Sequence, residues 1–123
     1  MLTRIDHVMI CVSDLQQGID AYTRLGFNIS PSGVHPGQGT QNAIVFHEED
    51  YLELLSVRDR DEYLSGHPGG GLLEFLARGG GFRYIAVQSA DLEADAARAR
   101  GRSARDRWAW RRLPDYFSAE DTA

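Results

Sequence analysis

The chain has 123 residues, enough for one domain or for two small modules that share a core. Its composition, 42% hydrophobic and 25% charged, is that of an ordinary soluble globular protein, and no aliphatic run approaches the ~20 residues of a transmembrane helix. The net charge of -5 disfavours a nucleic-acid partner, and the single cysteine, Cys11, excludes an intrachain disulfide and a cysteine-cluster zinc site. We therefore expect a cytoplasmic protein without nucleic-acid or membrane partners.

All 13 basic residues are arginines, so phosphate-binding and Schiff-base chemistry that depends on lysine is excluded. Seven of these arginines lie in residues 98–112, which we interpret as a solvated face or a loose tail. Two triple glycines, at 69–71 and 79–81, lack the strand-loop-helix context of a phosphate cradle. The sequence therefore predicts no nucleotide cofactor.

The first 57 residues have the pattern of a βαβββ module. Residues 4–12 alternate as in a strand, and Ser13 or Asp14 then caps a helical stripe that ends at Gly26. A short strand at 27–29, a loop at 31–39 rich in turn residues and two strands at 42–46 and 51–57 complete the module.

Residues 58–81 read as a connector, with a helical turn possible at 58–66 and a short helix predicted at 72–77. Residues 82–92 then repeat the pattern of residues 5–15 at a constant offset of 77 and lead into a second helical pattern that ends at Gly101. We predict a partial second module over 82–123, and thus an α+β fold built from one and a half modules.

Two polar residues interrupt strands that otherwise favour burial. Glu53 lies within the apolar run 51–55, where an unpaired buried carboxylate would need a metal ion, another cation or a proton. His7 lies between Ile5 and Met9 on one strand face, and imidazole and carboxylate groups on adjacent strands can bind a divalent ion together. The alternatives are that Glu53 points into water and that His7 is a packed, hydrogen-bonded histidine.

Three segments carry a resemblance to a known superfamily: Ile5-Asp-His-Val8, the helix closing on Leu25-Gly-Phe27, and Tyr51-Leu-Glu-Leu-Leu55. Together they resemble the vicinal oxygen chelate superfamily, which includes glyoxalase I, extradiol dioxygenases and the fosfomycin- and bleomycin-resistance proteins. The stretch from His35 to Asn42 is similar to the glyoxalase-like domain branch. The resemblance implies two βαβββ modules paired into a cup-shaped mixed sheet.

The resemblance also implies a metal site and a catalytic role for Glu53. Metal-using members carry a histidine on the first strand and a glutamate on the fourth strand of a module, and His7 and Glu53 match those positions. Two further ligands come from the partner module, but the residue that matches His7 there is Tyr84, and the counterpart of Glu53 falls beyond residue 123. This chain therefore cannot complete the four-ligand site in the usual way.

Three explanations follow. Either two chains pair as a homodimer so that two His7/Glu53 pairs meet, or the site binds a small molecule without a metal, or the chain is an inactive, shortened relative. The first implies lyase, isomerase or dioxygenase chemistry on a small oxygenated molecule, with a divalent ion as cofactor. We expect His35, Gln41 and Asn42 to orient a polar small-molecule ligand, with ordinary loop polarity as the alternative, and in the shared site we expect Tyr84 to line the wall of the cup.

Overall fold

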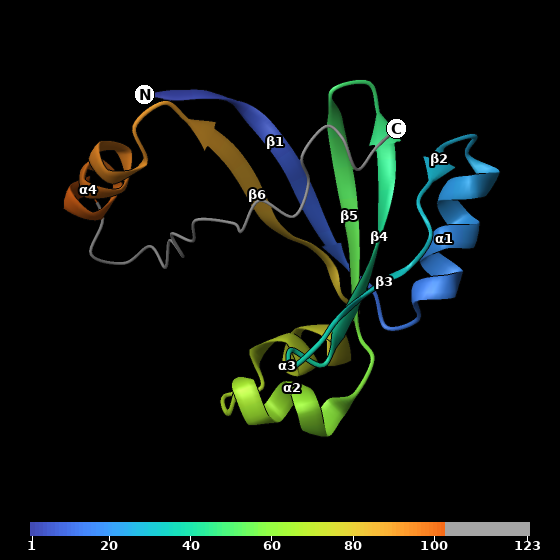
Figure 1. Ribbon diagram of the computed structural model, residues 1–123. Helices are drawn as coiled ribbons and strands as arrows, with labels where there is room; N and C mark the ends of the chain where they lie inside the picture. Colours follow the sequence, from blue (N-terminus) through green and yellow to red (C-terminus); the bar gives the residue numbers. More distant parts are fainter. Residues whose placement is uncertain (103–123) are drawn as a thin grey trace. The chain divides into compact units, whose positions relative to one another are not determined.

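The computed structural model describes the backbone of residues 1–102 and the side chains of residues 1–99. The described part contains six strands in one sheet and four helices (Figure 1). In chain order they are β1 (Leu2–Cys11), α1 (Leu15–Arg24), β2 (Asn28–Ile29), β3 (Gly33–His35), β4 (Thr40–His47), β5 (Asp50–Val57), α2 (Arg60–Gly66), α3 (Gly71–Ala77), β6 (Gly81–Ser89) and α4 (Leu92–Arg102).

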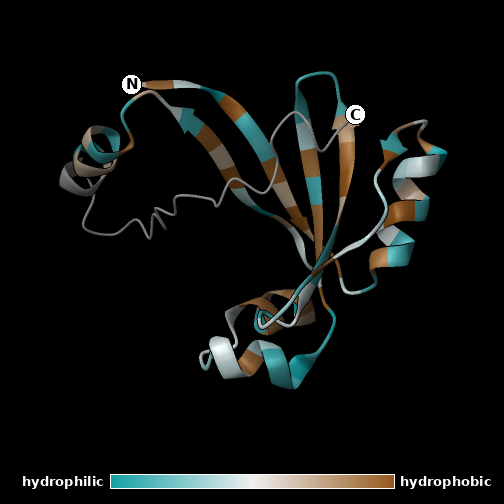
Figure 2. Ribbon diagram, viewed as in Figure 1, coloured by the Kyte–Doolittle hydropathy of each residue, from teal (hydrophilic) through white to brown (hydrophobic). Residues whose placement is uncertain are grey.

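The sheet is mixed, and its strands follow the order β2-β4-β5-β1-β6, with β3 paired to β4. β1 runs parallel to β5, and β4 runs antiparallel to β5, to β2 and to β3. Figure 2 shows the hydrophobic stretches of β4 and β5, the strands at the centre of this sheet. The α+β fold class predicted from the sequence is confirmed, whereas the division at 1–57, 58–81 and 82–123 stays a prediction.

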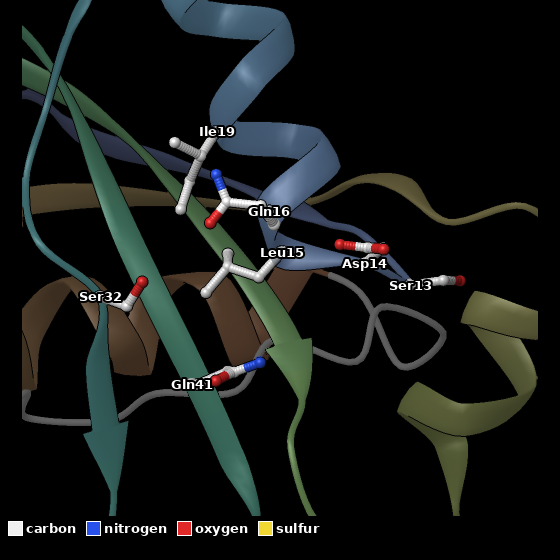
Figure 3. Close-up of a pocket in the computed structure, with 7 residues that line it drawn as sticks. All are labelled: Ser13, Asp14, Leu15, Gln16, Ile19, Ser32 and Gln41. Atoms are coloured by element: carbon white, nitrogen blue, oxygen red, sulfur yellow. The ribbon is translucent and has the colours of Figure 1, made fainter.

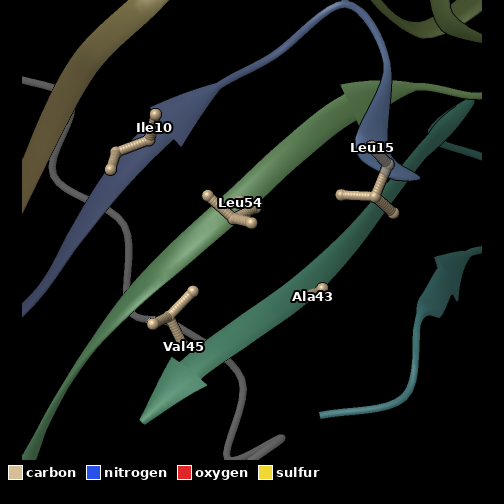
Figure 4. Packing of buried hydrophobic residues seen from close by; sticks show 5 residues of the cluster. All are labelled: Ile10, Leu15, Ala43, Val45 and Leu54. Atoms are coloured by element: carbon tan, nitrogen blue, oxygen red, sulfur yellow. The ribbon is translucent and has the colours of Figure 1, made fainter. Parts of the chain in front are cut away.

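Helix α1 covers one face of the sheet, which we call the α1 face. Asp14 caps the helix by accepting a hydrogen bond from the backbone N–H of Gln17 at 3.1 Å, and Gly26 ends the segment with φ = 94°, a conformation that favours glycine. The buried core on this face consists of one helix residue and four strand residues (Figure 4): Ile10, Leu15, Ala43, Val45 and Leu54. The predicted helix is thus confirmed.

Helices α2 and α3 lie against residues on the opposite face, which we call the α3 face. Its core joins Cys11 of β1 to Tyr63 of α2 and Leu72 of α3, and the Tyr63 hydroxyl accepts a hydrogen bond from the Leu72 backbone N–H at 3.1 Å. Partly buried residues pack around this core: Met9, Phe75 and five aliphatic side chains from β5 and the two helices. The α3 helix confirms the helix predicted at 72–77.

The segment 31–39, predicted to be a loop throughout, contains the short strand β3. Its residues pair with β4 in the register Gly33↔Asn42 and His35↔Thr40. Turn residues surround this strand, and its three residues show no alternation of apolar and polar side chains that would have predicted it. They are extended because they hydrogen-bond to the neighbouring strand β4. The helical turn considered at 58–66 is helix α2.

The chain divides into two compact units: residues 3–88 hold the sheet with α1, α2 and α3, and residues 1–2 group with the segment from Ser89 onward. In the latter unit, Asp91 caps α4 through the backbone N–H of Ala94, and Ser89 donates a hydrogen bond to Asp95 at 2.6 Å. Most of the arginine-rich stretch 98–112 lies outside the described residues. Among the described residues, no helix is long and apolar enough to cross a membrane.

Candidate functional site

The parallel pairing of β1 with β5 places His7 and Glu53 on the same face of the sheet. In that register His7 lies beside Tyr51 and Met9 lies beside Glu53. Because side chains alternate along a strand, these four residues share one face, and Cys11 lies two residues beyond Met9. This is the α3 face, since Cys11 and Met9 pack with α3.

His7 is buried between two carboxylates. Only 6% of its surface is exposed; Nδ1 lies 2.7 Å from Oδ2 of Asp6, and Nε2 lies 3.5 Å from Oε2 of Glu53. A hydrogen bond at Nδ1 fixes the tautomer of a neutral imidazole, because Asp6 can only accept when ionised. Nδ1 then carries the proton, and the lone pair of Nε2 faces Glu53.

Tyr51 supports both His7 and Asp6. Its ring stacks on the imidazole with centroids 4.6 Å apart, and its hydroxyl hydrogen-bonds to Asp6. Burial, reinforced by the negative charges of Asp6 and Glu53, raises the pKa of Tyr51 well above its ordinary value. The phenol therefore stays protonated and donates to Asp6 across the physiological pH range.

Asp6 remains ionised for a related reason. Its partial burial raises the pKa, but hydrogen bonds with His7, Gln88 and Tyr51 and the electrostatic attraction of the His7 ring outweigh burial, so that the pKa of Asp6 lies below its ordinary value of 3.8. Gln88 of β6 donates to the other carboxylate oxygen at 3.1 Å. Asp6 is thus a permanent acceptor for the imidazole.

Glu53 does not point into water, since only 13% of its side chain is exposed. Asn42 of β4 donates from Nδ2 to Oε1 of Glu53 at 3.0 Å, which leaves Oε2 directed at His7. Asn42 was expected to contact a ligand; the structure brings it next to Glu53, which it orients.

Cys11, the next residue toward α3 on this face, is chemically quiet. It is 1% exposed, and burial raises the pKa of its thiol to about 11. Two charges have smaller, opposite effects: the positive charge of Arg83 lowers this pKa and the negative charge of Glu53 raises it. A thiol that stays protonated is a poor nucleophile and a poor metal ligand. Cys11 is therefore a core residue.

The remaining predicted site residues have other contacts within the described part of the chain. His35 Nδ1 lies 2.8 Å from the Thr40 hydroxyl, and Gln41 donates to the Ser56 hydroxyl at 3.1 Å. Gln41 follows Thr40 and precedes Asn42 on β4, so it points to the face opposite Asn42. Tyr84 of β6 is half exposed, with the Arg83 guanidinium carbon 5.1 Å from its ring centroid.

Gln41 lines a different cavity, at the N-terminal end of α1 (Figure 3). The cavity has a volume of about 320 Å³ and is lined by Ser13, Asp14, Leu15, Gln16, Ile19, Ser32 and Gln41. Neither His7 nor Glu53 borders it. The site residues that the sequence analysis missed are Asp6 and Tyr51. Asp6 could have been recognised, because an acidic residue directly before His7 is a possible hydrogen-bond partner of the imidazole.

Within the described part of the chain, no group of three or more His, Cys, Asp or Glu side chains could hold a metal ion. The donor types fit a divalent ion such as zinc, because one imidazole nitrogen and one carboxylate oxygen face each other. The spacing fits as well: two such ligands of a tetrahedral ion lie about 3.4 Å apart, given metal–ligand distances of ~2.0–2.2 Å. The described residues thus provide two protein ligands for such an ion, His7 and Glu53.

Comparison with known proteins identifies the fold family. The family model described as the glyoxalase-like domain matches residues 5–115, whereas no curated protein matches the chain. Methylmalonyl-CoA epimerase of Streptomyces coelicolor, in a complex with 2-nitronate-propionyl-CoA, is 31% identical, with 82% of this chain and 72% of that chain covered and a TM-score of 0.61.

Two further solved structures have a similar fold. Methylmalonyl-CoA epimerase of Mycobacterium tuberculosis is 27% identical over 81% of this chain and 64% of that chain, with a TM-score of 0.62. The hypothetical protein BH1468 of Bacillus halodurans is 21% identical over 80% and 67%, with a TM-score of 0.64, and shows the fold alone. The chain belongs to the glyoxalase-like domain family, within the vicinal oxygen chelate superfamily.

Proposed function

We propose that His7 and Glu53 hold a divalent metal ion to which a small oxygenated molecule binds through two neighbouring oxygens, and that the reaction is an isomerisation. The observation that carries this proposal is the 3.5 Å separation of His7 Nε2 from Glu53 Oε2. With Nδ1–H donated to Asp6, both of these atoms are acceptors. Two buried acceptors that face each other need a positive species between them.

A protonated His7 is the competing explanation for this arrangement, and the distance argues against it. An N–H···O hydrogen bond is ordinarily 2.7–3.2 Å long, and one to an ionised carboxylate is shorter still. The Asp6 contact, at 2.7 Å, is of that kind, whereas the Glu53 contact at 3.5 Å is not. The asymmetry favours one proton, on Nδ1, and a metal ion on the Glu53 side.

When bound, such an ion acts as a Lewis acid that polarises a carbonyl oxygen of the ligand. Asp6 and Tyr51 hold the His7 ring in place. Because Asn42 donates to only one oxygen of Glu53, the other oxygen is free to bind the ion or to exchange a proton with the ligand. Isomerase chemistry is favoured over the lyase and dioxygenase alternatives because the solved structures described above that are more than 25% identical are epimerases. Their ligands are CoA thioesters, which makes an acid or its thioester our expected substrate class.

Two protein ligands bind a metal ion weakly, and a second copy of the chain would supply another histidine and another glutamate. We propose this shared site as the way in which the ligand set is completed. The second candidate function is sequestration of a small molecule without a metal; it is favoured by the finding that no three-residue metal cluster occurs among the described residues.

Metal analysis of untagged protein separates the two functions. We expect cobalt, manganese or zinc to bind wild-type protein in calorimetric titrations, and we expect binding to be lost in His7→Ala and Glu53→Gln. His35→Ala is the matched control, because this histidine contacts Thr40 and not Glu53. Absence of metal binding in the wild type, or binding unchanged in His7→Ala and Glu53→Gln, would rule out the metal-dependent function and leave sequestration.

A further inference from the structure

Arg83 of β6 stands apart from the other arginines of the described chain. Among those whose side chains are described, only Arg4 and Arg83 are half-buried; the others are exposed. Arg4 forms ion pairs with Glu49 and Asp50 at 3.3 and 2.8 Å. Within residues 1–99, Arg83 forms no ion pair with a carboxylate.

Two aromatic rings hold the Arg83 guanidinium instead. Its central carbon lies 4.9 Å from the centroid of the Phe75 ring on α3 and 5.1 Å from that of Tyr84. Cation–π contacts of this kind orient a guanidinium but use none of its five N–H donors. The side chain is thus positioned by its π-face contacts, and within residues 1–99 no side-chain hydrogen bond or ion pair uses its N–H donors.

Arg83 extends to the face of the sheet that carries Glu53. Phe75, beneath the guanidinium, packs with Cys11 and Met9 on the α3 face. The thiol of Cys11 lies within the electrostatic influence of both Arg83 and Glu53, which act on it in opposite directions. Arg83 and the His7–Glu53 pair therefore lie on the same face of the sheet.

We propose that Arg83 binds a carboxylate group of the ligand whose other oxygens occupy the His7–Glu53 site. A half-buried cation whose donors bind no described residue is stabilised by an anion, and the planar fork of guanidinium matches a carboxylate through two parallel hydrogen bonds. The inference rests on the proposed function and narrows its substrate class to acids that keep one free carboxylate. Phe75 and Tyr84 serve as positioning residues for the guanidinium.

Malonate is a suitable probe, because it carries two carboxylates and no other recognition group. We expect malonate to shift NMR resonances of the Arg83 side chain in wild-type protein at constant ionic strength, and we expect its neutral dimethyl ester not to do so. Arg83→Gln should weaken malonate binding by about tenfold or more, since a charge-assisted bidentate pair is lost. Arg83→Lys should weaken it as well, because lysine keeps the charge without the fork.

Arg78→Gln is the matched control, since Arg78 lies on the surface just after α3 and pairs with Glu74 at 2.6 Å. Malonate affinity should be unchanged in this variant. Equal affinity in wild type, Arg83→Gln and Arg83→Lys would overturn the proposal, and so would inorganic phosphate binding in place of malonate.

Metal titration of the same variants separates this inference from the proposed function. Arg83→Gln should still bind cobalt, which also shows that its fold is intact, while His7→Ala should not. If wild type binds malonate through Arg83 but binds no metal, the carboxylate site stands and the metal-dependent function fails. If metal binds but malonate affinity does not depend on Arg83, the carboxylate site fails alone.

Discussion

The rings of His7 and Tyr51 are stacked on neighbouring parallel strands, with centroids 4.6 Å apart and planes inclined by only 9°. Tyr51 also hydrogen-bonds to Asp6, the residue that fixes the opposite edge of the imidazole. The candidate site is therefore held by a three-residue unit, in which one side chain supports the other two.

This unit predicts a graded effect of substitutions at Tyr51. Tyr51→Phe keeps the stacked ring and loses one hydrogen bond to a charged group, so we expect the free energy of unfolding to fall by about 1–2 kcal/mol. Tyr51→Leu also loses the ring, and we expect a loss of about 3 kcal/mol. Urea denaturation measures both values; a Tyr51→Leu variant as stable as Tyr51→Phe would show that stacking contributes nothing.

Asp6 predicts a dependence of stability on pH. Because its pKa is lower in the folded chain than the ordinary 3.8, ionised Asp6 stabilises the fold fully above that value, and this stabilisation is lost as the pH falls through the lowered pKa. Wild type should therefore exceed Asp6→Asn in stability at neutral pH, and the difference should shrink in acid. Urea midpoints measured from about pH 7 down to about pH 3 test this. A difference that is constant over that range would contradict it.

Gly39 predicts a large effect of a small substitution. Its φ is 68°, and a Cβ there would collide with the backbone of Tyr63 and come within 2.5 Å of the Asp59 carbonyl oxygen. Both neighbours are backbone at the start of α2 and cannot rotate away, so we expect Gly39→Ala to destabilise the protein by about 3 kcal/mol or more. Gly37→Ala is the control: its φ is 78°, but, its two chain neighbours aside, no atom of the described residues lies within 4 Å of the added methyl group. We expect about 1 kcal/mol there, by thermal or urea unfolding. Equal losses at the two positions would contradict the steric argument.

The sequence was sufficient to single out His7 and Glu53, because a polar residue within an apolar strand is costly unless it has a partner. It could not identify Tyr51, which is an ordinary strand residue until β1 pairs with β5 and brings His7 beside it. Arg83 was hidden for the same reason, since its aromatic contact Phe75 belongs to a different element. These relationships arise from tertiary pairing, which local periodicity does not encode.

The sequence analysis placed Gln41 and Asn42 in one ligand site, although both are adjacent residues of strand β4. Adjacent residues of a strand point to opposite faces, so only one of them could lie beside Glu53. Asn42 does, with a hydrogen bond of 3.0 Å, and Gln41 contacts Ser56 instead. The predicted strand began at residue 42, whereas β4 begins at Thr40, so Gln41 was not recognised as a strand residue that points away from Asn42.

Strand β6 predicts self-association. It lies at the end of the described strand order and exposes four large apolar side chains: Phe82, Tyr84, Ile85 and Val87. A sheet edge with exposed apolar residues is a template for pairing with another chain, so we expect a dimer by light scattering at micromolar concentration. Ile85→Asp should shift the equilibrium toward monomer, and Val34→Asp on β3, where the apolar residue is also half exposed, should not. A wild-type monomer would contradict this prediction.

Association through β6 also bears on the metal site, because a shared site needs two chains. If two His7/Glu53 pairs bind one ion, metal content should be one ion per two chains, and Ile85→Asp should lose metal affinity together with the dimer. Ile85 makes no part of the His7–Glu53 contacts, so a direct effect on the ligands is not expected. One ion per chain in the monomeric variant would instead show that each pair binds its ion alone, with water and the ligand as the remaining donors. A crystal structure of the dimer with the two Glu53 carboxylates far apart would exclude the shared site directly.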